Sequence, residues 1–247
     1  LILLCLPMIG FGQNVNIPDA NFKAVLVGNS TINTNGDSEI QVSEATAFNG
    51  TIDCESMNIS NLTGIEAFTA LENLECGSNN LTSLDVTSNT SLIELWCSYT
   101  QLTSFDVSNN TNLTLLYCPY NQLTTLDVSA TTALTMLWCE ENNQLTSLDL
   151  RNGNNTNFHL MDAYDNPNLT CINVDDVAWS TTNWTNIDPH HYFSNNCPPP
   201  TSIKEHTTNK ELLKVTDILG RETKGTKNEV LFYIYDDGTV EKRIVIE

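Results

Sequence analysis

The sequence predicts a mostly β solenoid made of coils of 21 residues. Four cysteines recur at intervals of 21 residues, at positions 76, 97, 118 and 139. Four aspartates recur at nearly the same interval, at positions 85, 106, 127 and 149. A fixed period of this length is the signature of a repeat fold, because one coil cannot bury its apolar side alone and stacked coils share a continuous core.

One coil illustrates the repeated motif. Residues 113–123 read LTLLYCPYNQL, which has the form LxxLxCxxNxL. Leu116 and Cys118 alternate with Tyr117, so this stretch predicts a short strand. The second half, LTTLDV at 123–128, alternates again and predicts an extended segment on the opposite wall. The motif resembles the leucine-rich repeat, with cysteine in the central apolar position, and this resemblance implies a compact leucine-rich repeat solenoid over residues 51–170.

Two inward columns are expected to be structural. The cysteine column is interpreted as a ladder of buried thiols, because parallel side chains suit disulfide dihedrals poorly and no His or carboxylate shares the column to bind a metal. Its members are Cys54, Cys76, Cys97, Cys118 and Cys139. The motif asparagines are expected to satisfy buried backbone groups at each turn. They are Asn79, Asn121, Asn142 and Asn166, with Thr100 in the same position of one coil.

The residue between the leucine and the cysteine of each strand points outward, on the face that lines the concave surface in the leucine-rich repeat family. Exposed aromatic side chains framed by acids on such a face usually mark a binding surface. The alternative is that the rings only stack across strands and stabilise the sheet. The candidate ligand-binding residues are Glu75, Trp96, Tyr117, Trp138 and Asp162 in this column, and Glu94, Tyr99 and Tyr120 beside it.

The charge is strongly asymmetric along the chain. The net charge is −20, and eight of the ten Lys and Arg residues follow Pro200. An acidic surface of this kind repels nucleic acid and anionic membranes. It suits cations, basic partners or neutral ligands such as glycans.

The N-terminal region is interpreted in two parts. Residues 1–13 begin with an apolar run that ends in small residues, which predicts a secretory signal peptide lacking its own N-terminal end. The run is too short to span a membrane, and the sequence shows no other membrane segment. Residues 14–50 predict a cap, with a helix over 20–27 that begins at Asp19 and covers the open end of the solenoid with Phe22, Val25 and Leu26.

A polar loop in this cap, at 33–44, resembles an EF-hand calcium loop. A hard cation takes six to eight oxygen ligands at such spacing. The loop departs from the family pattern, because Asn33 stands where Asp is usual and Ser38 where Gly is usual. The alternative is a polar turn. The resemblance implies one structural calcium ion held by Asn33, Asn35, Asp37, the carbonyl of Glu39, and Glu44.

Residues 171–197 leave the repeat and predict a C-terminal cap. Cys171 and Cys197 bracket it and are expected to form a disulfide, which in an exported chain contributes about 3 kcal/mol. Trp179, Trp184 and Phe193 are expected to cover the last coil. His190 and His191 lack a third metal ligand at a familiar spacing. The three prolines after Cys197 begin a linker at 198–209.

Residues 210–247 predict a small β domain with strands near 211–218, 230–235 and 240–246 and a hairpin turn at 236–239. The segment from Asp217 to Glu222, DILGRE, and the final EKRIVIE resemble the type A C-terminal sorting domain of the type IX secretion system. This resemblance implies export to the surface or exterior of a Gram-negative bacterium through that machinery. The alternative is an ordinary β appendage.

The sequence favours a non-enzymatic, monomeric binding protein for an extracellular protein or glycan. It contains no nucleophile elbow, no phosphate-binding glycine loop and no cluster of His and acid on one element. The acids Glu140 and Glu141 are adjacent, so on a strand they face opposite ways and cannot flank one bond. The second interpretation is a passive exported scaffold with no ligand of its own.

Overall fold

The computed structural model describes residues 12–198, 212–217, 220–223, 230–235 and 240–244. The chain divides into two compact units, residues 1–200 and 201–247. Most of the predicted signal peptide and of the predicted linker lies outside the described residues. No helix in the described part of the chain is long and apolar enough to cross a membrane.

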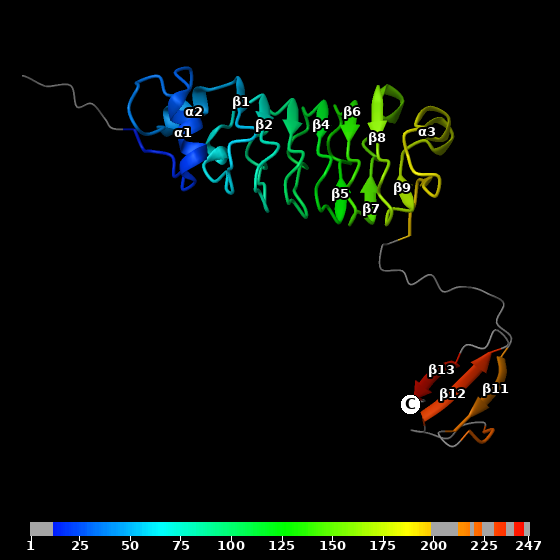
Figure 1. Ribbon diagram of the computed structural model, residues 1–247. Coiled ribbons are helices and arrows are strands. Elements are labelled where there is room, and N and C mark those ends of the chain that lie inside the picture. The colour runs from blue at the N-terminus through cyan, green and yellow to red at the C-terminus, as the bar shows by residue number, and fades with distance from the viewer. Residues whose placement is uncertain (1–11, 199–211, 218–219, 224–229, 236–239, 245–247) are drawn as a thin grey trace, which may run out of the picture. The chain divides into compact units, whose positions relative to one another are not determined.

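The first unit is a solenoid with two parallel sheets on opposite walls (Figure 1). Each strand pairs with the equivalent strand of the next coil, as Leu74 pairs with Leu95 and Leu95 with Leu116. The longer sheet has six strands, β1 (Thr51–Asp53), β2 (Asn73–Glu75), β3 (Glu94–Trp96), β4 (Leu115–Tyr117), β6 (Met136–Trp138) and β8 (Leu160–Asp162). The shorter sheet has four, β5 (Thr125–Asp127), β7 (Ser147–Asp149), β9 (Cys171–Asn173) and β10 (Tyr192–Ser194).

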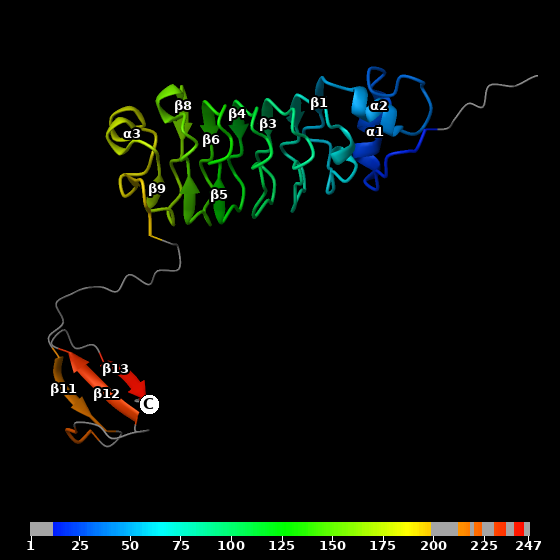
Figure 2. The same ribbon diagram turned by 180° about the vertical axis from the view of Figure 1, so that it is seen from behind.

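This arrangement confirms the predicted mostly β solenoid and its second extended segment. Figure 2 shows the same stack of coils from behind. On the shorter sheet, Asp127 and Asp149 are register neighbours on adjacent strands, so their outward carboxylates lie side by side. Upstream, Asp85 accepts hydrogen bonds from the backbone and hydroxyl of Thr87, which lower the pKa of Asp85. Local hydrogen bonds of this kind offset the repulsion within the aspartate column.

The core between the walls includes the cysteine ladder. Its five thiols, at positions 54, 76, 97, 118 and 139, are buried and unpaired. Burial raises the pKa of Cys97 to about 12. A neutral thiol of this kind behaves as a small apolar side chain, so the ladder is part of the core, as predicted.

The predicted asparagine column is also confirmed. Asn121 donates from Nδ2 to the carbonyls of Cys97 and Cys118, at 2.9 and 3.2 Å, and accepts from the backbone N–H of Leu102 at 3.2 Å. Each such side chain therefore joins its own coil to the preceding one.

A second buried column was missed by the sequence analysis. Asn110 donates to the carbonyls of Val86 and Asn89, at 3.0 and 2.8 Å. Asn89 makes the equivalent bonds one coil earlier, to Ile65 and Phe68. Thr131 and Asn152 continue the column. The solenoid thus has two internal polar ladders, one at each of two turns.

The N-terminal cap contains α1 (Ala20–Gly28) and α2 (Val42–Ala47), followed by the single turn η1 (Ile65–Ala67). Asp19 caps α1 by accepting from the N–H groups of Asn21 and Phe22. Phe22 and Leu26 are fully buried, and Val25 packs on the same core. The predicted helix, its cap and its apolar face are confirmed.

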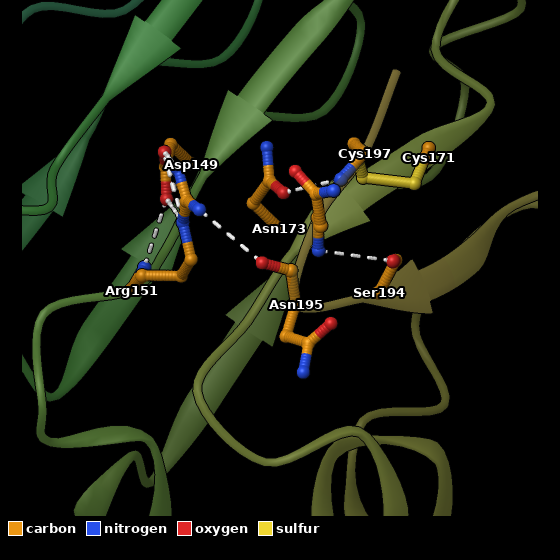
Figure 3. Close-up of a disulfide and its surroundings, with 8 residues drawn as sticks. Asp149, Arg151, Cys171, Asn173, Ser194, Asn195 and Cys197 are labelled. Atoms are coloured by element: carbon orange, nitrogen blue, oxygen red, sulfur yellow. Dashed lines mark hydrogen bonds and ion pairs between the residues drawn. A yellow bond between two sulfur atoms is a disulfide. The ribbon is translucent and has the colours of Figure 1, made fainter.

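The C-terminal cap contains α3 (Val177–Asn183) together with β10, and the single turn η2 (Asn155–Asn157) lies in the repeats before it. The predicted disulfide joins Cys171 on β9 to Cys197, with a Cα–Cα distance of 5.8 Å (Figure 3). Trp184 is 4% exposed, and its ring lies 5.3 Å from that of Phe158 and 5.7 Å from that of Phe193. Aromatic packing thus covers the last coil.

The second unit is a three-stranded antiparallel sheet of β11 (Leu212–Thr216), β12 (Val230–Tyr235) and β13 (Val240–Ile244). The predicted small β domain is present. Arg221 pairs with Asp217 at 2.7 Å, within the DILGRE segment. The predicted hairpin turn at 236–239 lies outside the described residues.

Candidate binding surface

The six-stranded sheet places the predicted outward residues side by side. Register pairs Glu75 with Trp96, Trp96 with Tyr117, and Tyr117 with Trp138. Asp162 follows Trp138 on the next strand. We call Trp96, Tyr117 and Trp138 the aromatic column. Their ring centroids are 4.9 and 5.6 Å apart, and all three side chains are half-buried.

The side chains beside the aromatic column orient it and widen it. Trp96 donates from Nε1 to Glu94 at 3.1 Å, which leaves one edge of the indole fixed. Leu115 pairs with Glu94 and is buried, and Met136, which pairs with Leu115, is half-buried and adds apolar surface to the face. Aromatic and Met side chains are enriched at binding surfaces, and here they stand beside acids that add charge to the face.

Tyr99 and Tyr120 form a second aromatic group at the turn that follows the strands. Their rings are stacked 4.2 Å apart at 9°, and the side chains are 53% and 39% exposed. The hydrogen bond between the two hydroxyls raises the pKa of Tyr120 to about 12. Both residues have a left-handed backbone, with φ of 50° and 56°, a conformation that costs energy for residues other than Gly.

The acids on this face lack a nearby cation. Burial and the charges of Asp53, Glu55 and Glu94 raise the pKa of Glu75. The only Lys and Arg residues between positions 12 and 198 are Lys23 and Arg151. Lys23 pairs with Glu39 at 2.6 Å, and Arg151 pairs with Asp149 on the shorter sheet (Figure 3). Within the described solenoid, the face therefore carries uncompensated negative charge.

Two further residues belong to this face: Glu140, which the sequence places in a column beside the aromatic residues, and Tyr164, which the sequence analysis missed. Glu140 is only 6% exposed, and its Oε2 atom has no hydrogen-bond partner. Tyr164, 38% exposed, lies one coil further at the equivalent position. The sequence signal for Tyr164 was weak, because its coil has Ala163 in place of the ladder cysteine and is longer than the others.

Comparison with known proteins identifies the repeated unit. Residues 111–152 match the family model for leucine-rich repeats, in two copies. The fold is a leucine-rich repeat solenoid. No curated protein sequence matches the chain.

Several solved structures are similar to the chain. One is the functional domain of InlJ from Listeria monocytogenes, which includes a cysteine ladder; it is 26% identical, with a TM-score of 0.49, and the match covers 76% of this chain and 50% of that one. The chain thus spans half the length of the InlJ domain. Another is the internalin inlF from L. monocytogenes strain 4b F2365, at 16% identity and a TM-score of 0.43, covering 73% of this chain and 71% of that one.

The loop resembling an EF-hand, on the N-terminal side of the leucine-rich repeats, is held by its own hydrogen bonds. Asp37 accepts from Asn35 Nδ2 at 3.1 Å, and Glu44 accepts from the backbone N–H groups of Thr34 and Asn35 at 2.8 and 3.2 Å. Asn33 accepts from the N–H of Gly36. A calcium ion would have to displace Asn35 Nδ2 from Asp37, so the calcium site stays a prediction.

If this loop binds calcium, the thermal midpoint of unfolding rises with calcium concentration, because an ion bound only by the folded state stabilises it. Thermal unfolding in calcium, compared with magnesium at equal ionic strength, measures the effect. Equal curves in the two salts would leave the loop as the polar turn.

Beyond the leucine-rich repeats, the structure supplies the third ligand that His190 and His191 lacked in sequence. Ligand atoms of Asp188, His190 and His191 lie within 4.8 Å of one another. Asp188, however, accepts from the backbone N–H groups of Asp165 and Asn166 at 2.9 Å. Burial lowers the pKa of His191, which favours its neutral form. This group therefore joins the last coil to the preceding one through its hydrogen bonds.

Proposed function

We propose that the six-stranded face of this leucine-rich repeat solenoid binds an extracellular protein or glycan, and that the chain is a non-enzymatic interaction or adhesion protein. The aromatic column carries the proposal. Three large rings in contact on the outward side of a sheet form a patch that does not serve the core. Tyr and Trp supply large rigid contact area at low entropic cost, and their faces also stack on sugar rings.

The acids support a protein partner as well as a glycan. Glu75, Glu94 and Asp162 border the aromatic column and have no neighbouring Lys or Arg among the described residues of the solenoid. Charge complementarity of this kind accelerates association and selects partners.

A binding screen tests the proposal. The whole chain is screened against a glycan array and a panel of extracellular proteins, beside the triple variant W96A/Y117A/W138A. Affinity for any hit is expected to fall by at least about 100-fold, because aromatic anchors dominate binding energy. The control is D85A/D106A/D127A, a triple variant of the aspartate column on the opposite side of the coils, checked like the first for folding by circular dichroism.

A hit that keeps its affinity in the aromatic variant would place the site elsewhere. The absence of any hit would favour the passive scaffold, for which the rings only stack across the strands. That alternative has its own support in the ring contacts along Trp96, Tyr117 and Trp138.

We also propose that residues 1–13 direct export and that residues 210–247 are a type IX sorting domain. The disulfide supports an oxidising compartment. The resemblance of DILGRE and EKRIVIE supports the sorting domain. A chain truncated after residue 200, expressed in a bacterium that has this system, is expected to stay in the periplasm. Unchanged surface delivery of the truncated chain would contradict the proposal.

A further inference from the structure

Glu140 occupies a distinctive place on the six-stranded face. The parallel hydrogen bonding continues past the strands here, because the N–H of Tyr120 donates to the Glu140 carbonyl at 3.1 Å and the N–H of Glu141 donates to the Tyr164 carbonyl at 3.4 Å. Glu140 therefore lies between Pro119 and Tyr164 of the adjacent coils, just after Trp138 on its own coil.

The Glu140 carboxylate is costly to the folded chain. The residue is only 6% exposed, and its Oε2 atom has no hydrogen-bond partner. Burial raises its pKa, and the charges of Asp162 and Glu141 add to the effect. A buried carboxylate oxygen without a partner reduces stability, and carboxyls perturbed in this way cluster at functional sites.

Three aromatic residues are neighbours of Glu140 along the sheet. Tyr164 occupies the equivalent position of the next coil, Trp138 lies two residues before Glu140 on its own coil, and Tyr117 pairs with Trp138. The charge of Glu140 raises the pKa of Tyr164, and burial together with that charge raises the pKa of Tyr117. Trp138 contacts the Tyr117 ring at a centroid distance of 5.6 Å. Rings grouped around a carboxylate recognise organic cations, because the ring faces and the carboxylate attract the same positive charge.

We propose that Glu140, with Tyr117, Trp138 and Tyr164, forms a subsite for a lysine or arginine side chain of a basic protein partner. The inference rests on the proposed function and narrows its partner from protein or glycan to a basic protein. A neutral sugar has no cation to offer the carboxyl, and an anionic ligand is repelled by Asp162 and Glu141. Because Oε2 is shielded from solvent, the subsite requires a side-chain rotation at Glu140 or Tyr164, a kind of change that is common at interfaces.

The test uses the full chain and a decalysine peptide as probe, with the fully acetylated peptide as the neutral comparison. Binding is measured by titration calorimetry in about 150 mM salt. At this ionic strength charges are screened beyond a Debye length of about 8 Å, so long-range attraction contributes little. Glu140→Gln is expected to lower affinity for decalysine at least about tenfold, because it removes the desolvated charge. Two control variants make the same change of net charge elsewhere: Glu141→Gln at the adjacent position and Asp127→Asn on the shorter sheet. Each is expected to change the affinity for decalysine less than about twofold.

A measurement of stability shows whether a lost affinity reflects lost binding contacts or a folding defect. Glu140→Gln removes a buried charge, so its denaturant midpoint is expected to equal or exceed that of the native chain. Equal losses of decalysine affinity in all three variants, or no binding of decalysine, would overturn the cation subsite. If W96A/Y117A/W138A loses a neutral glycan that Glu140→Gln still binds, the cation subsite fails while the proposed binding face stands.

Discussion

Replacing Asn121 with alanine is expected to lower the free energy of unfolding by about 2–4 kcal/mol, because it orphans buried backbone groups in two coils. The Asn121 side chain is the acceptor for the Leu102 N–H and for the Thr100 hydroxyl. It also donates to the carbonyls of Cys97 and Cys118. In a stacked solenoid this loss acts on the interface between coils, which carries much of the stability.

Urea denaturation followed by circular dichroism measures the effect. Gln122→Ala, at the exposed neighbouring position, is the control and is expected to change stability by no more than about 0.5 kcal/mol. Asn121→Thr is expected to recover part of the loss, because Thr100 occupies the same column in the preceding coil. A loss below about 1 kcal/mol in Asn121→Ala would show that water replaces the side chain at this turn.

Removing the disulfide with Cys171→Ser and Cys197→Ser is expected to cost about 3–4 kcal/mol, since the bond closes a loop with a sequence separation of 26. The bond ties the chain that follows β10 to β9, and the N–H of Cys197 donates to Asn173 at 2.8 Å. Without it, α3 and β10 should open more often than the coils before them.

Hydrogen exchange with mass spectrometry locates this change. Faster exchange is expected in residues 177–197, with coils 73–138 unaffected. Reductant should reproduce the effect in the native chain and add nothing to the double variant. Cys118→Ala, which removes a ladder thiol, is the control and should keep its response to reductant. Uniformly faster exchange along the solenoid would mean that the cap is not an independent unit.

The fold was predictable where the period is exact. The pattern in residues 113–128 predicted the strands on both walls of the solenoid. The alternation of apolar and polar residues, together with the repeat of 21 residues, assigns each side chain to the core or the surface. The second polar ladder was missed because Asn89 and Asn110 lie in turns rich in Asn, Thr and Ser, where polar side chains are expected to be exposed. Burial there arises only when neighbouring coils stack, which no single coil reveals.

The candidate site divides in the same way. The aromatic column followed from the motif, since equal coil lengths bring Trp96, Tyr117 and Trp138 into register. The surroundings of Glu140 could not be predicted in the same way. The sixth coil is longer than the others, so the sequence alone does not show that Tyr164 occupies the position equivalent to Glu140. Asp188 joined His190 and His191 through the path of the last coil, which the sequence pattern does not encode.

The residue-by-residue pairing of successive coils has an evolutionary consequence. A gene duplication or deletion of one whole coil leaves every hydrogen-bonded column continuous, because each coil contacts its neighbours through equivalent positions. The outward residues on the six-stranded sheet are then free to diverge one coil at a time. Recombination can thus lengthen the six-stranded sheet or change its outward residues while the buried core residues stay the same.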